Sequence, residues 1–384
     1  MRNKKLVWRS MMKRKRIARL LFLTMVMVFF ANGCSTAGQT ATEVGKGTNA
    51  PVLNNNGEPE DGESILAVGD YSYRLEDMMY YIYVEEEIGW MNNDIYSSFY
   101  DEEEYSNYWD EIEDEEVGLT GEETAKEAVI LSVKKDLVWY QEALKRGITL
   151  DEEDKSAALE EYNSFCEELS DAQKSAAGMG EELLAYFEKQ QVIEKYKESL
   201  LEEAEFDEEA VSREVSAEEN REYVFECLEV YKEDDNDKTY PEKEMKEHVK
   251  ILESLAKKLD KKSDMESMIP DKYKDIVFYS DGTLLESEED NYGKYKKINI
   301  DKALKKLENG EISQIFETSY SYFVARMKDN NSSENYEEMV MQAVEDARNK
   351  IYDTAYENAV DGYSIVFHEE NWADITLGNL IYGL

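Results

Sequence analysis

The sequence predicts an α+β protein in which a mostly helical domain, built from both ends of the chain, carries a small inserted α/β domain. Apolar residues recur at helical spacing between residues 75 and 203, and again between 335 and 359. Between these segments, residues 221–231 and 319–327 have the composition of strands. Because helices of the same style flank the strands on both sides, we interpret residues 216–330 as an insertion.

The first residues have the order of a secretory signal. Nine basic residues precede position 20, no acidic residue occurs before Glu43, and an apolar run of twelve residues extends from Leu20 to Ala31. A membrane-spanning helix needs about 20 residues, so this run is too short to span. It ends in Phe-Ala-Asn-Gly-Cys-Ser, which resembles a lipobox, although Ala31 and Asn32 depart from the usual residues. We expect a lipoprotein signal peptide over residues 1–33 and lipidation of Cys34; the alternative is an ordinary cleaved signal.

Residues 34–62 contain mostly Ser, Thr, Gly, Asn, Pro and Glu, with almost nothing to bury, which predicts a flexible tether. Several acyl chains on Cys34 would hold the chain firmly at a membrane. The expected location is therefore extracytoplasmic, on the outer face of the bacterial cell membrane.

The charge of the chain excludes one large class of partners. The formal net charge is −43, and removing residues 1–34 takes away nine positive charges and no negative ones, which leaves about −52. Nucleic acid is not an expected partner, because binding phosphates needs a basic surface. Cys166 and Cys227, the remaining cysteines, either form a disulfide or stay as buried free thiols. With only two histidines, no metal site and no cofactor is expected.

The front domain is predicted over residues 63–215, and its elements follow from local pattern. A short strand and turn is expected over Ile65–Tyr73. Helices are expected over Leu75–Glu87, Thr124–Arg146, 150–169 and Glu181–Glu203, with Gly147 ending the second. Residues 92–120 are acidic and aromatic without clear period, which indicates a long loop with helical turns.

The inserted domain alternates between strands and helices. Strands are expected over Arg221–Tyr231 and Ser319–Met327, a short strand or bend over Ile276–Ser280, a helix along Met245–Leu259 and a short helix over Asp301–Leu307. Residues 331–384 return to the front domain. There a helix over 335–359 and a last strand over Tyr363–Ile375 are expected to complete it.

Two segments resemble known families. Residues 65–77, together with Glu-Ala-Leu-Lys-Arg-Gly-Ile-Thr-Leu-Asp-Glu-Glu at 142–153, resemble the helical chaperone domain of SurA- and PrsA-type foldases. Glu-Asn-Gly-Glu-Ile-Ser at 308–313, followed by residues 318–327, resembles the closing segment of a parvulin-type prolyl isomerase. The resemblance covers roughly residues 65–380 and implies a helical chaperone domain that carries a parvulin-like domain.

The resemblance also implies where a site would lie. Parvulins have two facing histidines, a cysteine or aspartate nearby and an apolar proline pocket. Here Glu226 and Phe323 stand at the two histidine positions, and Asp281 stands for the nearby polar group. The implied substrate-binding residues are Phe225, Ile300, Tyr322 and Phe323. His248 and His368 lie elsewhere in the sequence and are interpreted as solvated or structural.

Three functions remain open on this basis. The first is a membrane-anchored foldase or chaperone that binds unfolded exported polypeptides with weak or no isomerase activity. The second is an active prolyl isomerase with an altered site. The third is an acidic surface lipoprotein that acts as a binding or scaffolding module through residues 92–120; the alternative for that stretch is an insertion packed on the helical domain. If Glu226 is buried, it needs a partner, because an unpaired buried carboxylate is costly.

Overall fold

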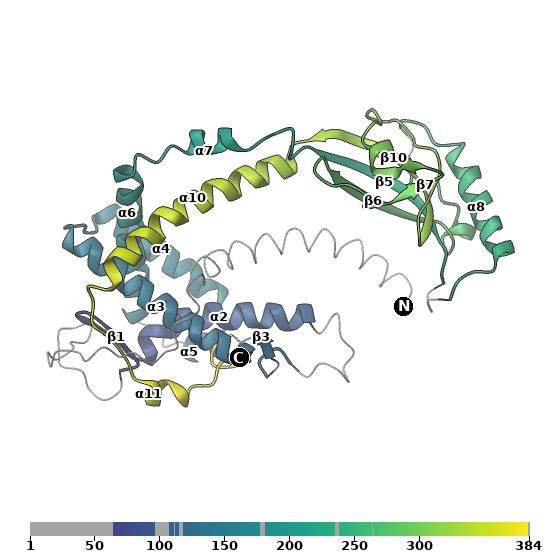
Figure 1. Ribbon diagram of the computed structural model, residues 1–384. Coiled ribbons are helices and arrows are strands. Elements are labelled where there is room, and N and C mark those ends of the chain that lie inside the picture. The colour runs from purple at the N-terminus through teal and green to yellow at the C-terminus, as the bar shows by residue number, and fades with distance from the viewer. Residues whose placement is uncertain are drawn as a thin grey trace. The chain divides into compact units, whose positions relative to one another are not determined.

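The computed structural model describes residues 64–96, 107–110, 112–114, 118–176, 181–234, 238–262 and 264–382. It is an α+β protein, as the sequence predicts (Figure 1). The described chain separates into two compact units. Residues 64–206 and 348–382 form a mostly helical unit, and residues 207–347 form a unit with a four-stranded sheet. The predicted signal peptide, Cys34 and the tether lie outside the described residues.

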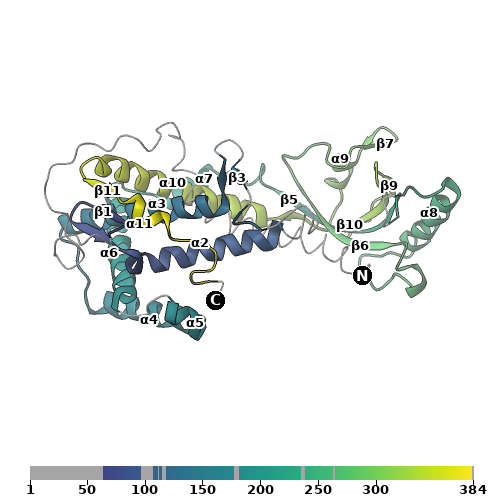
Figure 2. The same cartoon turned by 90° about the horizontal axis from the view of Figure 1, so that it is seen from below.

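The helical unit takes residues from both ends of the chain. Its helices are α2 (Leu75–Tyr96), α3 (Gly121–Lys145), α4 (Glu152–Glu168), α5 (Asp171–Ala176), α6 (Glu181–Glu203), the later part of α10 (Glu334–Val360) and α11 (Glu369–Ala373). Strands β1 (Leu66–Val68), β2 (Tyr71–Tyr73) and β11 (Ile365–Phe367) form an antiparallel sheet of order β11-β1-β2 (Figure 2). Because β11 pairs with β1, residues near the two ends complete one sheet. A hairpin of β3 (Ile112–Asp114) and β4 (Leu119–Thr120) precedes α3.

Capping residues set the helix ends in this unit. The Thr120 hydroxyl accepts the Glu123 N–H at 3.2 Å, and the Glu123 carboxylate accepts the Thr120 N–H at 2.9 Å, so α3 begins three residues before the predicted start. Asp151 and Asp154 form the same reciprocal pair at the start of α4. Gly147, with φ of 75°, follows α3 in the left-handed conformation that a helix stop favours.

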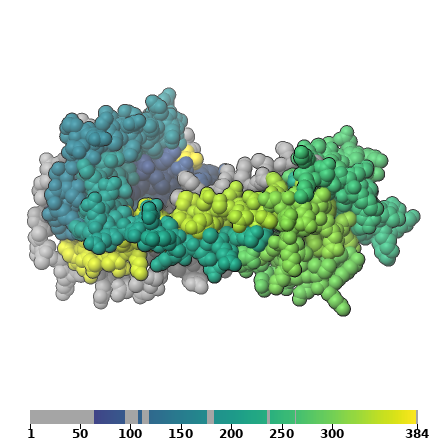
Figure 3. Space-filling model, turned by 90° about the horizontal axis from the view of Figure 1, so that it is seen from above, coloured from purple at the N-terminus to yellow at the C-terminus, as the bar shows by residue number. Residues whose placement is uncertain are grey.

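The main core of the helical unit lies between α2, α3, β1 and the C-terminal residues. Figure 3 shows one face of the outer surface of the protein. The most deeply buried side chains of the core include Leu66, Val68, Met78, Ile82, Val129, Val133, Leu137, Val138 and Ile381. Tyr108 and Trp109 pack in the same core and are 6% and 7% exposed. The described part of the acidic aromatic stretch at 107–110 is therefore packed on the helical unit.

The other unit is built on a sheet of order β6-β5-β10-β9. Its elements are α7 (Glu208–Glu214), β5 (Glu222–Tyr231), α8 (Glu242–Ala256), the 3₁₀ turn η1 (Asp271–Tyr273), β6 (Phe278–Leu285), β7 (Lys294–Tyr295), β8 (Ile298–Asn299), α9 (Ile300–Leu304), β9 (Phe316–Glu317), β10 (Ser321–Ser332) and the start of α10. Helix α8 packs on one face of the sheet through Leu252 and Leu255. Helix α9 packs on the other face through Ile300 and Leu304.

Several predicted elements differ from the structure. The strand expected over Tyr363–Ile375 stops at Phe367, because β1 offers only three partner residues and α11 then buries Trp372. The short strand expected over Ile276–Ser280 is the eight-residue β6, which pairs with β5 along its whole length. Helix α2 runs to Tyr96, so the loop expected from residue 92 begins as helix. Helices α5 and α7 are short and were not expected.

Candidate functional site

Alternation along β5 places the implied site residues on different faces of the sheet. Phe225 and Phe323 belong to the core that α9 covers. Glu226 is the next residue along β5, so its side chain points to the opposite face, where Leu228 packs under α8. Asp281 on β6 pairs directly with Glu226. The structure therefore brings Glu226 and Asp281 together and separates both from Phe323.

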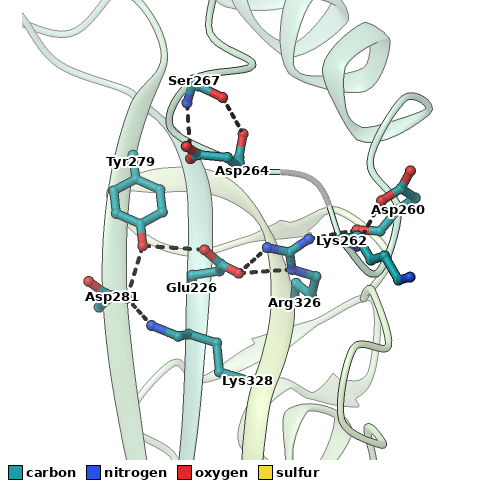
Figure 4. A network of polar contacts seen from close by, with 9 residues as sticks. All are labelled: Glu226, Asp260, Lys262, Asp264, Ser267, Tyr279, Asp281, Arg326 and Lys328. Atoms are coloured by element: carbon teal, nitrogen blue, oxygen red, sulfur yellow. Dashed lines mark hydrogen bonds and ion pairs between the residues drawn. The ribbon is translucent and has the colours of Figure 1, made fainter.

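Glu226 forms a buried ion pair with Arg326 of β10 (Figure 4). Each residue is 7% exposed. Both Nε and Nη2 of Arg326 donate to Oε1 of Glu226, the Nε bond at 2.8 Å, and Nη1 donates to the carbonyl of Asp260 at 2.6 Å. Arg326 is the partner that a buried Glu226 requires, as expected from the sequence.

Tyr279 and Lys328 extend this network to the sheet edge. The Tyr279 hydroxyl lies 3.3 Å from Glu226 and 3.1 Å from Asp281, and Lys328 Nζ lies 3.4 Å from Asp281 (Figure 4). Burial raises the pKa of Tyr279, and the Asp281 carboxylate raises it further. These groups join β5, β6 and β10 to one another, and we interpret them as structural.

The opposite face of the sheet carries a cluster of aromatic rings. Ring centroids of Phe316 and Phe323 are 5.6 Å apart, and Tyr292 lies 5.6 Å from Phe323 and 6.1 Å from Phe225. Gly282 pairs with Phe225 in the ladder, and a Cβ at that position would stand 2.6 Å from the Phe225 ring. A glycine is therefore required there for the ring to lie flat on the sheet.

A hollow of about 650 Å³ opens beside this cluster. It is lined by Asp290, Asn291, Tyr292, Gly293, Lys294, Tyr295, Lys296, Glu317, Thr318, Ser319 and Tyr320. Tyr292 contacts Phe323, and Tyr295 lies 6.5 Å from Phe316, so the tyrosines of the wall rest on the buried rings. The hollow thus carries three tyrosines among polar and charged residues, and they lie beside the buried aromatic cluster, which we call its floor.

Buried Asp301 holds the first wall of the hollow in place. Its carboxylate is 1% exposed and accepts the N–H of Asn291 at 2.6 Å and of Tyr292 at 3.0 Å. The wall then turns back through Lys296 and Lys297, with φ of 47° and 71°, between the paired strands β7 and β8. Positive φ at both central residues is the conformation of a tight hairpin turn, usually Asn-Gly, so two lysines here store backbone strain.

The second wall is the turn between β9 and β10. The Thr318 hydroxyl accepts the N–H of Ser321 at 3.0 Å and of Tyr320 at 3.3 Å. Lys232 Nζ donates to the Thr318 carbonyl at 2.6 Å and to Glu317 at 2.9 Å. Tyr320 stands at the tip of this turn and is 49% exposed. Among the tyrosines of the wall it is the exposed one, whereas Tyr292 and Tyr295 are half-buried.

The implied substrate-binding residues divide between the floor and the far side of the sheet. Phe225, Ile300 and Phe323 lie in the floor and are 0%, 0% and 2% exposed. Tyr322 packs at the edge of the core on the α8 side, and its hydroxyl donates to Glu317 at 2.7 Å. The aromatic residues that line the hollow are instead Tyr292, Tyr295 and Tyr320. Tyr295 belongs to the two-residue strand β7, and the other two lie in connecting segments, so the sequence shows no periodic signal for them.

Burial raises the pKa of Cys227 in the adjoining core and of Tyr320 in the wall. Cys227 is free and 6% exposed, and burial raises the pKa of its thiol, as do Glu229, Asp281 and Glu226. Burial also raises the pKa of Tyr320. Neither histidine lines the hollow. His248 is buried on α8 and stacks edge-on with Tyr240 at 4.8 Å, and His368 belongs to the helical unit.

Other expected features concern metals and membranes. In the described ranges, no group of three or more His, Cys, Asp or Glu residues could hold a metal ion. A search of the same ranges gives no helix with the length and apolarity needed to cross a membrane. Neither Cys166 nor Cys227 forms a disulfide, and the two lie in different units.

Comparison with known proteins gives similar solved structures only. No family model and no curated protein matches the chain. The chain is similar to a peptidylprolyl isomerase (PrsA) from Bacillus cereus at 15% identity and a TM-score of 0.22, covering 67% of this chain and 91% of that one. It is also similar to PrsA from Bacillus subtilis at 16% identity and a TM-score of 0.20, covering 67% of this chain and 92% of that one. The third similar structure is the foldase protein PrsA from Streptococcus pneumoniae, at 16% identity and a TM-score of 0.22, covering 65% of this chain and 89% of that one.

Proposed function

We propose that this chain is a membrane-anchored, extracytoplasmic chaperone of the foldase type that binds unfolded exported polypeptides and has weak or no prolyl isomerase activity. One observation carries the proposal: the hollow carries three tyrosines among polar and charged residues beside a buried aromatic floor, and neither histidine of the chain lines it. The location rests on the basic and apolar N-terminal sequence that ends at Cys34.

A site can bind an unfolded segment without strict geometry. Tyrosine offers a large ring with a polar tip, and ring surfaces accept many apolar side chains without strict geometry. Rotation about an X–Pro bond must instead cross a barrier of roughly 18–20 kcal/mol, which a site lowers by desolvating and twisting the imide. The hollow is open at Tyr320. An open wall supports holding more than it supports such desolvation.

An active isomerase is the second candidate, because bond rotation needs no proton transfer. The tyrosines that line the hollow, Tyr292, Tyr295 and Tyr320, offer rings against which a proline ring could pack. The scaffolding alternative depends on the acidic and aromatic residues 92–120 as a binding surface. Tyr108 and Trp109, the described aromatics at 107–110, are buried and offer no binding surface, which lowers its support.

The test uses the full-length chain in detergent micelles and a denatured client whose slow refolding phase is an X–Pro isomerisation. Aggregation and the slow phase are followed together. We expect suppressed aggregation with an unchanged slow phase. A slow phase that accelerates and saturates with the chain would replace the proposal by the isomerase. Unchanged aggregation and an unchanged slow phase would overturn both.

A pair of variants tests the hollow itself. Tyr320→Ala removes the exposed ring of the wall and should weaken client binding about tenfold, as the loss of a central aromatic contact does. Tyr336→Ala is the matched control, since Tyr336 is a half-buried tyrosine of α10 that does not line the hollow. Equal binding by both variants would remove the hollow from the proposed function.

A further inference from the structure

A second aromatic surface lies on the helical unit, between α2 and α4. We call it the α2–α4 aromatic surface and define it by five partly exposed rings: Tyr80, Tyr83, Tyr162, Phe165 and Tyr382. Tyr83 and Phe165 meet edge-on with ring centroids 5.0 Å apart. Tyr80 stacks on Tyr186 of α6 at 4.2 Å. Rings from α2 and α4 thus pack against one another and on α6, and each remains partly exposed.

The C-terminal residues complete this surface. Tyr382 lies 5.5 Å from Tyr83, between ring centroids. Its backbone is fixed from two sides: its N–H donates to the buried Glu86 carboxylate at 2.7 Å, and its carbonyl accepts from Gln173 of α5 at 3.0 Å. The ring is therefore held in place rather than carried on a loose end.

Carboxylates surround the rings. Glu87 follows Tyr83 by four positions on α2, so its carboxylate lies one helical turn from that ring. Glu168 follows Phe165 by three positions on α4 and lies one turn from that ring in the same way. Burial raises the pKa of Tyr80, and Glu87, Glu161 and Glu168 raise it further. Partial burial raises the pKa of Glu87 itself, and Glu168 adds to the shift. Glu87 and Glu168 thus add like charge from two helices to the aromatic surface.

Basic residues that could balance these carboxylates are missing from the elements that carry them. Helix α2 contains no Lys or Arg, and the only one in α4, Lys155, pairs with Glu152 at 3.1 Å. Among the described residues, Glu87, Glu161 and Glu168 form no ion pair with a Lys or Arg. The surface therefore combines ring faces with unbalanced negative charge.

We propose that the α2–α4 aromatic surface binds cationic, apolar segments of a polypeptide. Lys and Arg side chains suit it because their stems pack on rings while their charged ends reach the carboxylates or the ring faces. Opposite charge also speeds the encounter with the strongly acidic chain. This inference rests on the proposed function and specifies which client segments the helical unit selects.

The test measures binding of three labelled peptides of equal length by fluorescence anisotropy. Leu alternates with Lys in the first, with Gln in the second and with Glu in the third. The full-length chain is held in uncharged detergent micelles, and micelles alone supply the blank. We expect the Lys peptide to bind best and the Glu peptide worst, with the difference reduced by salt because exposed charges are screened.

Two double variants of equal charge decide the role of the surface. Glu87→Gln/Glu168→Gln should weaken the Lys peptide about tenfold and leave the Gln peptide unchanged. Glu160→Gln/Glu167→Gln is the control, because these exposed residues of α4 point away from Phe165 by helical spacing. Equal effects of the two double variants, or none, would overturn the inference.

Failure of this inference differs from failure of the proposed function. If the chain suppresses aggregation but binds the three peptides equally, only the cationic preference is wrong. If it neither suppresses aggregation nor binds any of the peptides, the proposed function is wrong, and this inference with it.

Discussion

Glu86 and Gly378, which are 292 positions apart in the sequence, are joined by a hydrogen bond of 2.8 Å from the Gly378 amide to the Glu86 carboxylate. Three more amides, those of Leu380, Ile381 and Tyr382, donate to the same carboxylate at 2.7 Å each. Glu86 is 0% exposed. Four N–H dipoles thus compensate a fully buried negative charge, and the carboxylate fixes the C-terminal residues against α2.

Glu86→Gln should destabilise the helical unit by about 3 kcal/mol, because the amide brings its own N–H donors towards backbone donors and removes the charge. The described tryptophans all lie in this unit, so urea unfolding followed by tryptophan fluorescence reports on it. Exposed Glu160→Gln serves as the control. An unchanged midpoint for Glu86→Gln would show that the C-terminal residues do not depend on this carboxylate.

Arg326→Met should leave Glu226 charged, buried and unpaired, at a cost of about 3–5 kcal/mol to the sheet unit. The double variant Glu226→Gln/Arg326→Met should regain most of that loss, since no buried charge remains. Hydrogen exchange of the β5 and β10 amides measures both. A double variant as unstable as the single one would contradict the ion-pair interpretation. Client binding at the hollow should not change, because the pair lies on the other face.

Asp301→Asn should loosen the first wall of the hollow. The amide keeps one acceptor where the carboxylate serves two N–H donors, so about 1–2 kcal/mol of local stability is lost. We expect faster hydrogen exchange at Asn291 and Tyr292 and weaker client binding. Asp271→Asn is the comparison, because Asp271 is an exposed residue of η1 that does not line the hollow. Faster exchange with unchanged binding would mean that the wall does not contact clients.

Lys189 should make a contribution to the stability of the helical unit that increases with pH above about 8. Its amine donates to the Tyr73 hydroxyl at 2.8 Å, and burial lowers its pKa to about 8, although Asp77 and Asp136 oppose the shift. An unfolded lysine titrates near 10.4, so between these values the unfolded chain binds a proton that the folded chain does not. This contribution therefore increases with pH across this window.

Lys189→Met should abolish that increase. Urea midpoints at about pH 7.5 and about pH 9.5, followed by tryptophan fluorescence, give the comparison. The pKa of Tyr73 is raised well above its usual value by burial, so this neighbour stays protonated in the window. A slope of the same size in the variant would assign the pH dependence to another group.

The helices that the sequence predicts best have both apolar residues at helical spacing and a capping residue. Helix α3 has apolar residues at helical spacing, a reciprocal cap at Thr120 and a stop at Gly147, and local chemistry alone sets its limits. The end of the C-terminal strand was predicted wrongly, because no local signal marks it. Its end at Phe367 depends on the length of β1, which lies about three hundred residues earlier and leaves no local mark.

The candidate site was harder to predict because β5 is buried on both faces. Phe225, Glu226, Cys227 and Leu228 are all buried, so the alternation that would assign each side chain to a face is hidden. If a known family is aligned to β5 with a shift of one residue, the matched side chain lies on the opposite face of the sheet. Tyr292 and Tyr320 meet only through tertiary structure, and neither turn has a period that could reveal them.

The pairing of β1 with β11 sets an order of events for a chain that emerges from its N-terminus. Leu66 meets its partner Phe367 only after residues 207–347 have all appeared. The helical unit must therefore wait in an unfinished state while the sheet unit, which is continuous in sequence, can already fold. Such long-range pairing slows folding, and the unpaired edge of β1 stays open to wrong partners in the meantime. A truncation before residue 365 would make that waiting state permanent.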